Sequence, residues 1–466
     1  MFYLKPLSLC TRFIDQVNAA LITMGGKKLS KAQKLWFSIC ITGVIITNSV
    51  CWRRFERAGF GKFCSKNLSK MFRKGKLGWD AILMASVLNI FEKYHITEGV
   101  LALDGTDNKR SKNTSTISKV HSIKDKASGG FIKGQELTIV VLITSQITLP
   151  VGFEFYEPNP AHREWKKTDA TLKNQGLLKK DRPKPPAKNS EYPTMIESAL
   201  NLLRQFETNY PKIKVKAILA DALYGAKSFV KPASKLFGGV QIISQARKNQ
   251  KVRSGNKYIS VEQYFIRNPG VARNLKIRGD KEQTVSMHGA RLHLKAHGCK
   301  RFIVALKYEG EQEYRYLLAS NLTWRLTDIA AAYTLRWLVE GFIQDWKAYE
   351  GWCQLAKQPG VDGSRRGLIL SLLVDHCLLL HPDQMALIKN KLPAVTVGSL
   401  RDRERATAVV DAVESLVAND QSKPVIIELR KCIETAIPLR KSSKHMSSRD
   451  LGRLESTPSL KYKNAA

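Results

Sequence analysis

The sequence predicts a mixed α/β protein whose core is interrupted by a β-rich insertion and flanked by helical regions. Apolar segments that end at Asp104 and Asp221 have the composition of buried strands, and residues 134–143 and 147–156 are patterned as two more strands. Strand-like segments also fill the long interval between Asp221 and a helix near position 340. Helical periodicity dominates both ends of the chain.

The charge balance points to a nucleic-acid partner. The 466 residues include 76 Lys and Arg against 40 Asp and Glu, so the formal net charge is +36 and the protein attracts polyanions. A membrane is not the expected partner because no clean basic amphipathic helix is present. The apolar residues 35–52 contain Ser, Thr and Asn, which favours a buried helix over a membrane span. No signal-peptide pattern and no disulfide framework is visible, so we expect a soluble, unsecreted protein.

The first 95 residues are predicted to form a basic helical DNA-binding region. Helices are expected at 31–52, 52–60 and 79–94, and acidic residues are scarce between them. The alternative is a helical cap with a solvated basic face. The positive charge exceeds what solubility requires, and this excess favours contact with DNA.

The remaining chain divides into four predicted parts. Residues 96–238 form the first part of the core, with a polar basic loop at 108–130, a long basic loop at 158–192, a helix at 194–210, a strand at 214–221 and a helix at 222–237. The β-rich insertion covers residues 239–321, with strands at 240–246, 258–265, 291–296, 302–308 and 314–319. Residues 322–385 complete the core, and residues 386–466 form a C-terminal helical region with a basic tail from 440. From residue 365 onward, helices are expected at 365–380, 384–391, 397–416 and 424–436.

The two aspartates at strand ends are the first candidate site residues. In the order strand, strand, strand, helix, strand, helix, the first and fourth strands can lie side by side in a mixed sheet, so Asp104 and Asp221 converge. Each also has a purely structural alternative. Asp104 can start a turn, and Asp221 can cap the helix that follows it.

A single helix over residues 333–347 supplies the other candidates. At about 100° per residue, Tyr333, Arg336, Glu340 and Lys347 fall on one polar stripe, while an apolar face on the other side docks the helix on the core. The alternative is a solvated helix in which Arg336 and Glu340 form an ion pair at i,i+4.

Together these residues suit phosphodiester chemistry. The carboxylates of Asp104, Asp221 and Glu340 could hold two Mg²⁺ ions, which prefer hard oxygen ligands and activate a water or a 3′-hydroxyl. Arg336 and Lys347 could hold DNA phosphates, and Tyr333 could form a hydrogen bond or stack at the end of a DNA strand. A zinc site at His293, His297 and Cys299 is not expected because a fourth ligand is missing.

These motifs resemble the DDE transposases of bacterial insertion sequences, in the IS-four group with the YREK signature. The resemblance rests on the spacing Y-x2-R-x3-E-x6-K within TLRWLVEGFIQDWK, on LDGTD around Asp104 and on LADALYG around Asp221, and it spans about residues 30–385. It implies a ribonuclease-H-like core in which the three carboxylates bind two Mg²⁺ ions, with Mn²⁺ as a substitute. It also implies that Tyr333, Arg336 and Lys347 contact DNA phosphates near the cleaved end.

The resemblance further implies an activity and partners. The expected protein is a cytoplasmic, nucleoid-associated bacterial enzyme that cleaves double-stranded DNA at terminal inverted repeats and joins the 3′ ends to target DNA as a homodimer. Relatives that form a hairpin stack a flipped base on a Trp of the insertion, which has none between residues 240 and 321; Trp324 lies just beyond, and Tyr308, Tyr314 or Tyr316 could substitute. Two alternatives stay open: a nuclease that only cuts, and a non-catalytic DNA-binding regulator.

Overall fold

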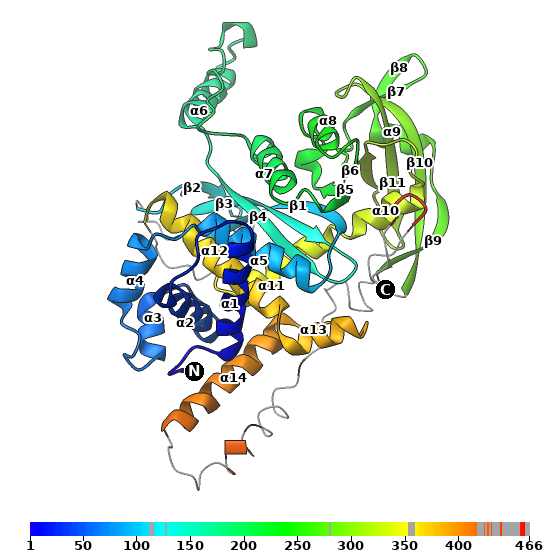
Figure 1. Cartoon of the computed structure of the whole chain (residues 1–466). Coiled ribbons are helices and arrows are strands. Elements are labelled where there is room, and N and C mark those ends of the chain that lie inside the picture. The colour runs from blue at the N-terminus through cyan, green and yellow to red at the C-terminus, as the bar shows by residue number, and fades with distance from the viewer. Residues whose placement is uncertain are drawn as a thin grey trace.

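A computed structural model describes residues 1–110, 116–125, 128–278, 281–352 and 359–416, together with residues 424, 426–427, 430, 439 and 457–461. Helices lie on both faces of one large mixed sheet, which extends on one side into a β-rich lobe (Figure 1). The predicted helix at 424–436 and the basic tail lie mostly outside the described residues.

The N-terminal region is a helical bundle packed on the core. Its helices are α1 (Ser8–Thr23), α2 (Lys31–Thr47), α3 (Trp52–Ala58), α4 (Ser65–Lys74) and α5 (Trp79–Lys93). Helix α2 starts at a capping box formed by Ser30 and Gln33, and its eleven residues from 36 to 46 are buried, as the apolar composition predicts. The helix predicted to continue to residue 52 ends at Thr47, because Asn48 adopts a left-handed conformation. Helices α1 and α4 were not predicted. No helix in the described ranges is long and apolar enough to cross a membrane.

The core sheet has the predicted mixed topology. Strands β1 (Glu98–Lys109), β3 (Phe131–Ile143) and β4 (Thr148–Tyr156) form an antiparallel meander, and β5 (Lys214–Ala220) and β6 (Gln241–Gln245) run parallel to β1. The order β4-β3-β1-β5-β6 is that of a ribonuclease-H-like sheet. Helix α7 (Met195–Asn209) packs on β3 and β4, and α8 (Lys227–Leu236) follows the short helix η2 (Ala222–Gly225). The predicted fold class is confirmed.

The insertion extends the core sheet without a break. Strand β6 pairs with β12 (Arg315–Ala319), which pairs with β11 (Cys299–Tyr308) and then β10 (Lys281–Leu294). The smaller strands β7 (Lys251–Ser254), β8 (Lys257–Ser260) and β9 (Val271–Arg278) complete the lobe. The strand predicted at 258–265 is wrong beyond Ser260. A capping box of Ser260 with Gln263 starts helix α9 (Val261–Arg267) there.

The long loop predicted at 158–192 is also wrong in part, because residues 160–174 form helix α6 (Pro160–Asn174), followed by the short helix η1 (Lys179–Asp181). Helix α6 has no buried residue, so the apolar periodicity by which helices are recognised is missing. Its start is fixed locally, since the Asn159 side chain accepts hydrogen bonds from two backbone amides and Pro160 occupies the first turn. The loop predicted at 108–130 contains a strand, β2 (His121–Lys124).

The helix predicted at 333–347 is two helices. α10 (Leu326–Thr334) and α11 (Trp337–Tyr349) meet at a tight turn, where the backbone amides of Leu335 and Arg336 bond three residues back rather than four. α12 (Gly360–Leu379), α13 (Pro382–Lys389) and α14 (Val397–Leu416) follow. Trp346 of α11 stacks on Trp352 at 4.8 Å and donates to Ser371 of α12, which anchors the apolar face of α11 as predicted.

Candidate active site

Asp104 and Asp221 lie at neighbouring positions of two parallel strands. Ala102 of β1 pairs with Leu219 of β5, so two residues further along, Asp104 stands beside Asp221 with only one strand spacing, about 5 Å, between the backbones. Asp104 does not start a turn: β1 continues to Lys109 because β3 pairs with it over that whole length. The adjacency of the two aspartates is therefore as predicted, and the turn alternative for Asp104 is wrong.

Asp221 caps the short helix that follows β5. Its Oδ1 accepts a hydrogen bond from the Leu223 amide at 2.8 Å, which is the capping role considered from the sequence, and this leaves Oδ2 for another ligand. Two residues that sequence patterns did not single out for this role hold the segment. Ser244 donates to the Asp221 carbonyl at 2.5 Å, and the buried His297 donates from Nε2 to the Gly225 carbonyl at 3.0 Å.

His297 has no free ring nitrogen for a metal. Its Nδ1 accepts a hydrogen bond from Arg301 at 3.1 Å, while Nε2 is used on Gly225. Burial lowers the pKa of the imidazole, and the neighbouring positive charge of Arg301 adds to this effect. The neutral His297 therefore serves to position the loop behind Asp221.

The turn between α10 and α11 brings the third carboxylate to the aspartates. Tyr333 lies in the last turn of α10, Arg336 precedes α11, and Glu340 lies in the first turn of α11. Arg336 donates from Nη1 to Asp104 Oδ2 at 2.9 Å and from Nη2 to Glu340 Oε1. Its guanidinium thus joins carboxylates that are 236 residues apart in sequence, and the i,i+4 pair considered for a solvated helix exists within this larger contact.

Asp104 is affected by the charges of both other carboxylates. Burial raises the pKa of Asp104, and the charges of Asp221 and Glu340 add to the rise, whereas Arg336 and the Gly105 amide oppose it. Clustered carboxylates with this repulsion attract a cation. In the described ranges, however, no three His, Cys, Asp or Glu side chains are placed to hold one metal ion together. The cation between Asp104 and Glu340 is Arg336.

Tyr333 faces the same cluster with an unpartnered hydroxyl. The Arg336 guanidinium lies 5.9 Å from the centre of its ring, and the buried Oη has no hydrogen-bond partner among the described residues. Burial raises the pKa of Tyr333 to about 12; the neighbouring Arg336 opposes this rise, whereas the charges of Asp221 and Asp104 add to it. The hydroxyl is therefore protonated at neutral pH and available as a donor.

Lys347 stands two turns further along α11. Its Nζ lies 3.5 Å from Oδ1 of Asp107, three residues beyond Asp104 on β1. Five of the predicted site residues therefore lie close together beside β1 and the end of β5: Asp104, Asp221, Tyr333, Arg336 and Glu340. The sixth, Lys347, lies at the margin of this group. Asp107 was not among the predicted site residues; its only signal was its place in the LDGTD motif.

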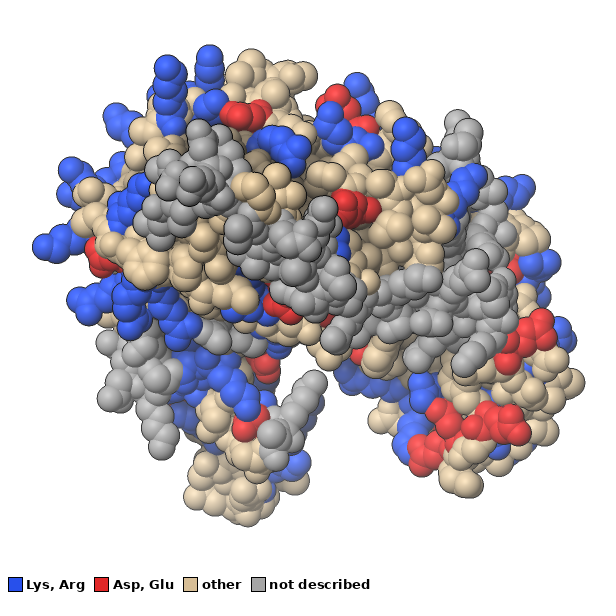
Figure 2. Space-filling model, turned by 90° about the horizontal axis from the view of Figure 1, so that it is seen from below, with Lys and Arg blue, Asp and Glu red and all other residues tan. Residues whose placement is uncertain are grey.

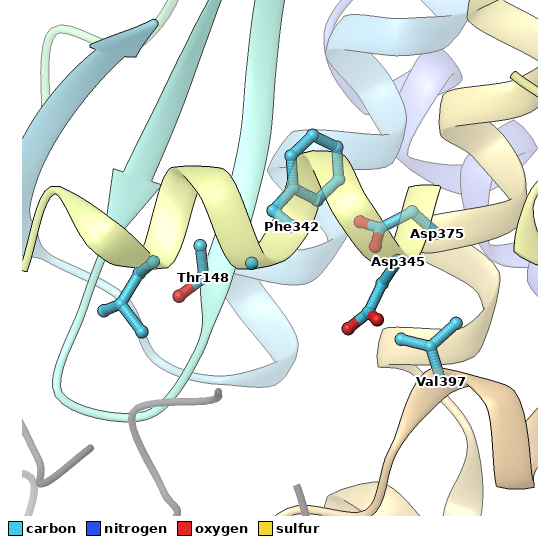
Figure 3. Close-up of a pocket in the computed structure, with 7 residues that line it drawn as sticks. Thr148, Phe342, Asp345, Asp375 and Val397 are labelled. Carbon is cyan, nitrogen blue, oxygen red and sulfur yellow. The ribbon is translucent and has the colours of Figure 1, made fainter. Parts of the chain in front are cut away.

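The opposite face of α11 carries a second set of carboxylates. Asp345 lines a small cavity with Asp375 of α12 and Thr148 of β4, and Figure 3 shows the Asp345 and Asp375 carboxyl groups near each other beside Val397. Burial raises the pKa of Asp375 and of the fully buried Glu350 well above their ordinary values, and each is further raised by Asp345. This cluster lies behind the helix that carries Glu340.

Two aromatic side chains considered for a flipped base are buried. Trp324 and Tyr316 are 8% and 7% exposed, so neither presents a free ring face. Tyr308 and Tyr314 are partly exposed, and each has a cation over its ring, from Arg315 and Lys307 respectively. Of the predicted candidates, these two tyrosines have the accessible rings.

Comparison with known proteins gives a family for most of the core. Residues 97–371, from β1 to α12, match the family described as "Transposase DDE domain". Similar solved structures are the NurA nuclease from Sulfolobus solfataricus (8% identity, 51% of this chain and 72% of that chain, TM-score 0.21) and the Drosophila P element transposase strand transfer complex (12% identity, 54% and 53%, TM-score 0.22). No curated protein matches the sequence.

Proposed function

This chain belongs to the transposase DDE domain family, and we propose that it is a cut-and-paste transposase of the IS-four type with the YREK signature. It binds the terminal inverted repeats of an insertion sequence, cleaves the ends and joins the 3′ ends to target DNA. The observation that carries the proposal is that Arg336 joins Asp104 of β1 to Glu340 of α11, while Asp221 at the end of β5 lies beside Asp104 and adds its charge there.

The donor set fits divalent metal ions. The carboxylates of Asp104, Asp221 and Glu340 are hard oxygen ligands whose mutual repulsion two Mg²⁺ or Mn²⁺ ions would relieve. When bound, such ions activate an attacking hydroxyl and neutralise charge on the phosphodiester. Arg336 must leave at least one carboxylate for the ions to enter.

The remaining polar residues fit a DNA backbone. Once released from the carboxylates, Arg336 can hold a phosphate through its two donor edges, Lys347 can hold a neighbouring phosphate, and the free Tyr333 hydroxyl can donate to a third oxygen. Away from the site, the start of α2 carries a surface hollow lined by lysines of the predicted DNA-binding region: Lys27, Lys28, Lys31, Lys34 and Lys76. These helices are proposed to grip the terminal repeat, in a homodimer that acts on bacterial DNA in the cytoplasm.

Glu340→Gln tests this function. The amide keeps the size of the side chain and a hydrogen bond to Arg336 but removes the charge that a metal requires, so we expect Mg²⁺-dependent cleavage of terminal-repeat DNA to be lost while DNA affinity stays within about threefold of wild type. Glu207→Gln on the exposed face of α7 is the matched control and should cleave normally. A parallel loss of binding and cleavage would mean that α11 is a scaffold.

Products separate the proposed transposase from the alternatives. When terminal-repeat DNA is incubated with a target plasmid, gel electrophoresis should show a joined product whose size is the sum of the two DNA molecules. Cleavage without joining would identify a nuclease, and binding without metal-dependent chemistry would identify a regulator.

A further inference from the structure

Residues 157–193, here called the arm, leave the end of β4 and project from the body of the protein (Figure 1). No residue of α6 is buried, and the other residues of the arm are also at least partly exposed. The arm therefore contributes nothing to the hydrophobic core.

The arm is ordered by its own contacts. Trp165 donates from Nε1 to the Pro183 carbonyl at 2.8 Å, and Arg182 donates from Nη1 to both carboxylate oxygens of Asp169 at 2.9 Å. The Trp165 ring also stacks on His162 at 5.1 Å. The returning segment thus covers one face of α6 and holds the helix as one side of a hairpin.

The uncovered face of α6 is basic. At 100° per residue, Arg163, Lys166, Lys167 and Lys173 lie within about 120° of one another, and this basic arc borders the covered face that carries Trp165 and Asp169. All four basic side chains are exposed, and among them only Lys167 has an ion pair, a weak 3.7 Å contact with Glu164. From Arg163 to Lys173 the face is about 15 Å long, roughly four base-pair steps of a duplex.

The arm starts at the edge of the sheet that carries the proposed site. Tyr156, the last residue of β4, pairs with Glu136 of β3, and Glu136 pairs with Asp107 of β1. The base of the arm is therefore about two strand spacings, or roughly 10 Å, from the residue that contacts Lys347. A duplex seated at Asp104 passes within reach of a helix that is about 22 Å long.

We propose that the basic face of α6 binds the phosphate backbone of duplex DNA next to the cleavage site, without reading its sequence. Residues 157–193 contain nine Lys and Arg against five Asp and Glu, so the arm carries a net positive charge that complements the negative charge of DNA. Figure 2 shows Lys and Arg side chains over much of another face of the molecule, with fewer acidic groups. The inference rests on the proposed function because it takes DNA as the substrate.

The test neutralises this face and measures the salt dependence of binding. Each phosphate contact adds about 0.9 to the slope of log affinity against log salt, so the combined substitution Arg163→Gln, Lys166→Gln, Lys167→Gln and Lys173→Gln should lower the slope by about 2 to 4 on a 60-base-pair duplex. Glutamine preserves helix propensity, and circular dichroism and thermal unfolding should match wild type because no residue of α6 is buried. The charge-preserving control is Arg163→Lys with Lys166→Arg, Lys167→Arg and Lys173→Arg, which should keep the wild-type slope.

The outcomes distinguish the arm from the catalytic proposal. An unchanged slope in the neutralised variant overturns the arm inference. If the slope is unchanged but the variant no longer forms the complex in which a homodimer holds two terminal repeats, the arm contacts a second copy of the chain instead. On a short duplex that ends at the cleavage site, the neutralised variant should retain metal-dependent cleavage. If wild-type protein fails to cleave that short duplex, the proposed function fails, whatever the slope shows.

Discussion

Replacing Arg336 by alanine should tighten the binding of divalent metal in the absence of DNA. Arg336 contacts Asp104 at 2.9 Å and also Glu340, so its positive charge occupies the place where a metal would be attracted. A divalent ion about 5 Å from a guanidinium is repelled by about 7 kcal/mol at an effective dielectric constant of 20 and by less than about 2 kcal/mol in water. The site lies between these limits, because the Arg336 and Glu340 side chains are 15% and 33% exposed.

The expected gain in affinity is one to three powers of ten. This range corresponds to about 1.4 to 4 kcal/mol and allows for partial outward movement of Arg336 in the wild-type protein. Calorimetric titration with Mn²⁺ at pH 8 in the absence of DNA measures it directly. In the presence of terminal-repeat DNA, the same variant should cleave more slowly, because the proposed phosphate contact of Arg336 is gone.

Two controls define the result. Lys347→Ala removes a cation that contacts Asp107 rather than the proposed metal ligands, so its Mn²⁺ affinity should stay within about threefold of wild type. Arg336→Ala combined with Glu340→Gln should lose the gain. The reasoning is refuted if Arg336→Ala binds Mn²⁺ no more tightly than wild type.

Two further predictions concern neighbouring groups. Tyr333→Phe removes a hydroxyl that makes no hydrogen bond with the described residues, so the free energy of unfolding should change by less than about 0.5 kcal/mol, while cleavage of terminal-repeat DNA falls about tenfold if the hydroxyl donates to a phosphate. The raised pKa values of Asp375 and Glu350 mean that the folded state holds more protons than the unfolded state, so stability falls as pH rises above about 5, by about 1.4 kcal/mol per pH unit for each proton retained. Asp375→Asn should make this decline shallower in urea unfolding between pH 5 and pH 9, and an unchanged slope would show that Asp375 keeps no proton.

The sequence was sufficient for the parts of the site that depend on local pattern. The apolar segments that lead to Asp104 and Asp221 predicted that the first and fourth strands can lie side by side, and the pairing of Ala102 with Leu219 brings the two aspartates together in this way. The separate apolar face of the helix around Glu340 also predicted correctly which side of α11 docks.

The features that depend on distant contacts were not predictable. Strand β1 continues past Asp104 because residues of β3 about 30 positions later pair with it, which no local pattern reveals. The tight turn before Arg336 has ordinary helical composition, so only the packed structure shows two helices there. The bond from Arg336 to Asp104 spans 232 residues, and the helical wheel could show only its partner Glu340.

The arm was missed for a different reason. Helix prediction depends on an apolar stripe that faces a core, and α6 faces only its own return segment. The signals that could have found it are Asn159 followed by Pro160, a start signal for a helix, and Trp165 in an otherwise polar stretch. A helix stabilised by a cap and one local tryptophan contact carries too little periodicity to be recognised.

The pairing of β6 with β12 has a mechanical consequence. Strand β6 is hydrogen-bonded to β5 on one side and to β12, the last strand of the insertion, on the other, so the core sheet continues into the lobe through paired strands. A swing of the lobe as a separate lid would have to break this pairing. A load applied to the lobe is therefore passed through β6 to β5, the strand that leads to Asp221.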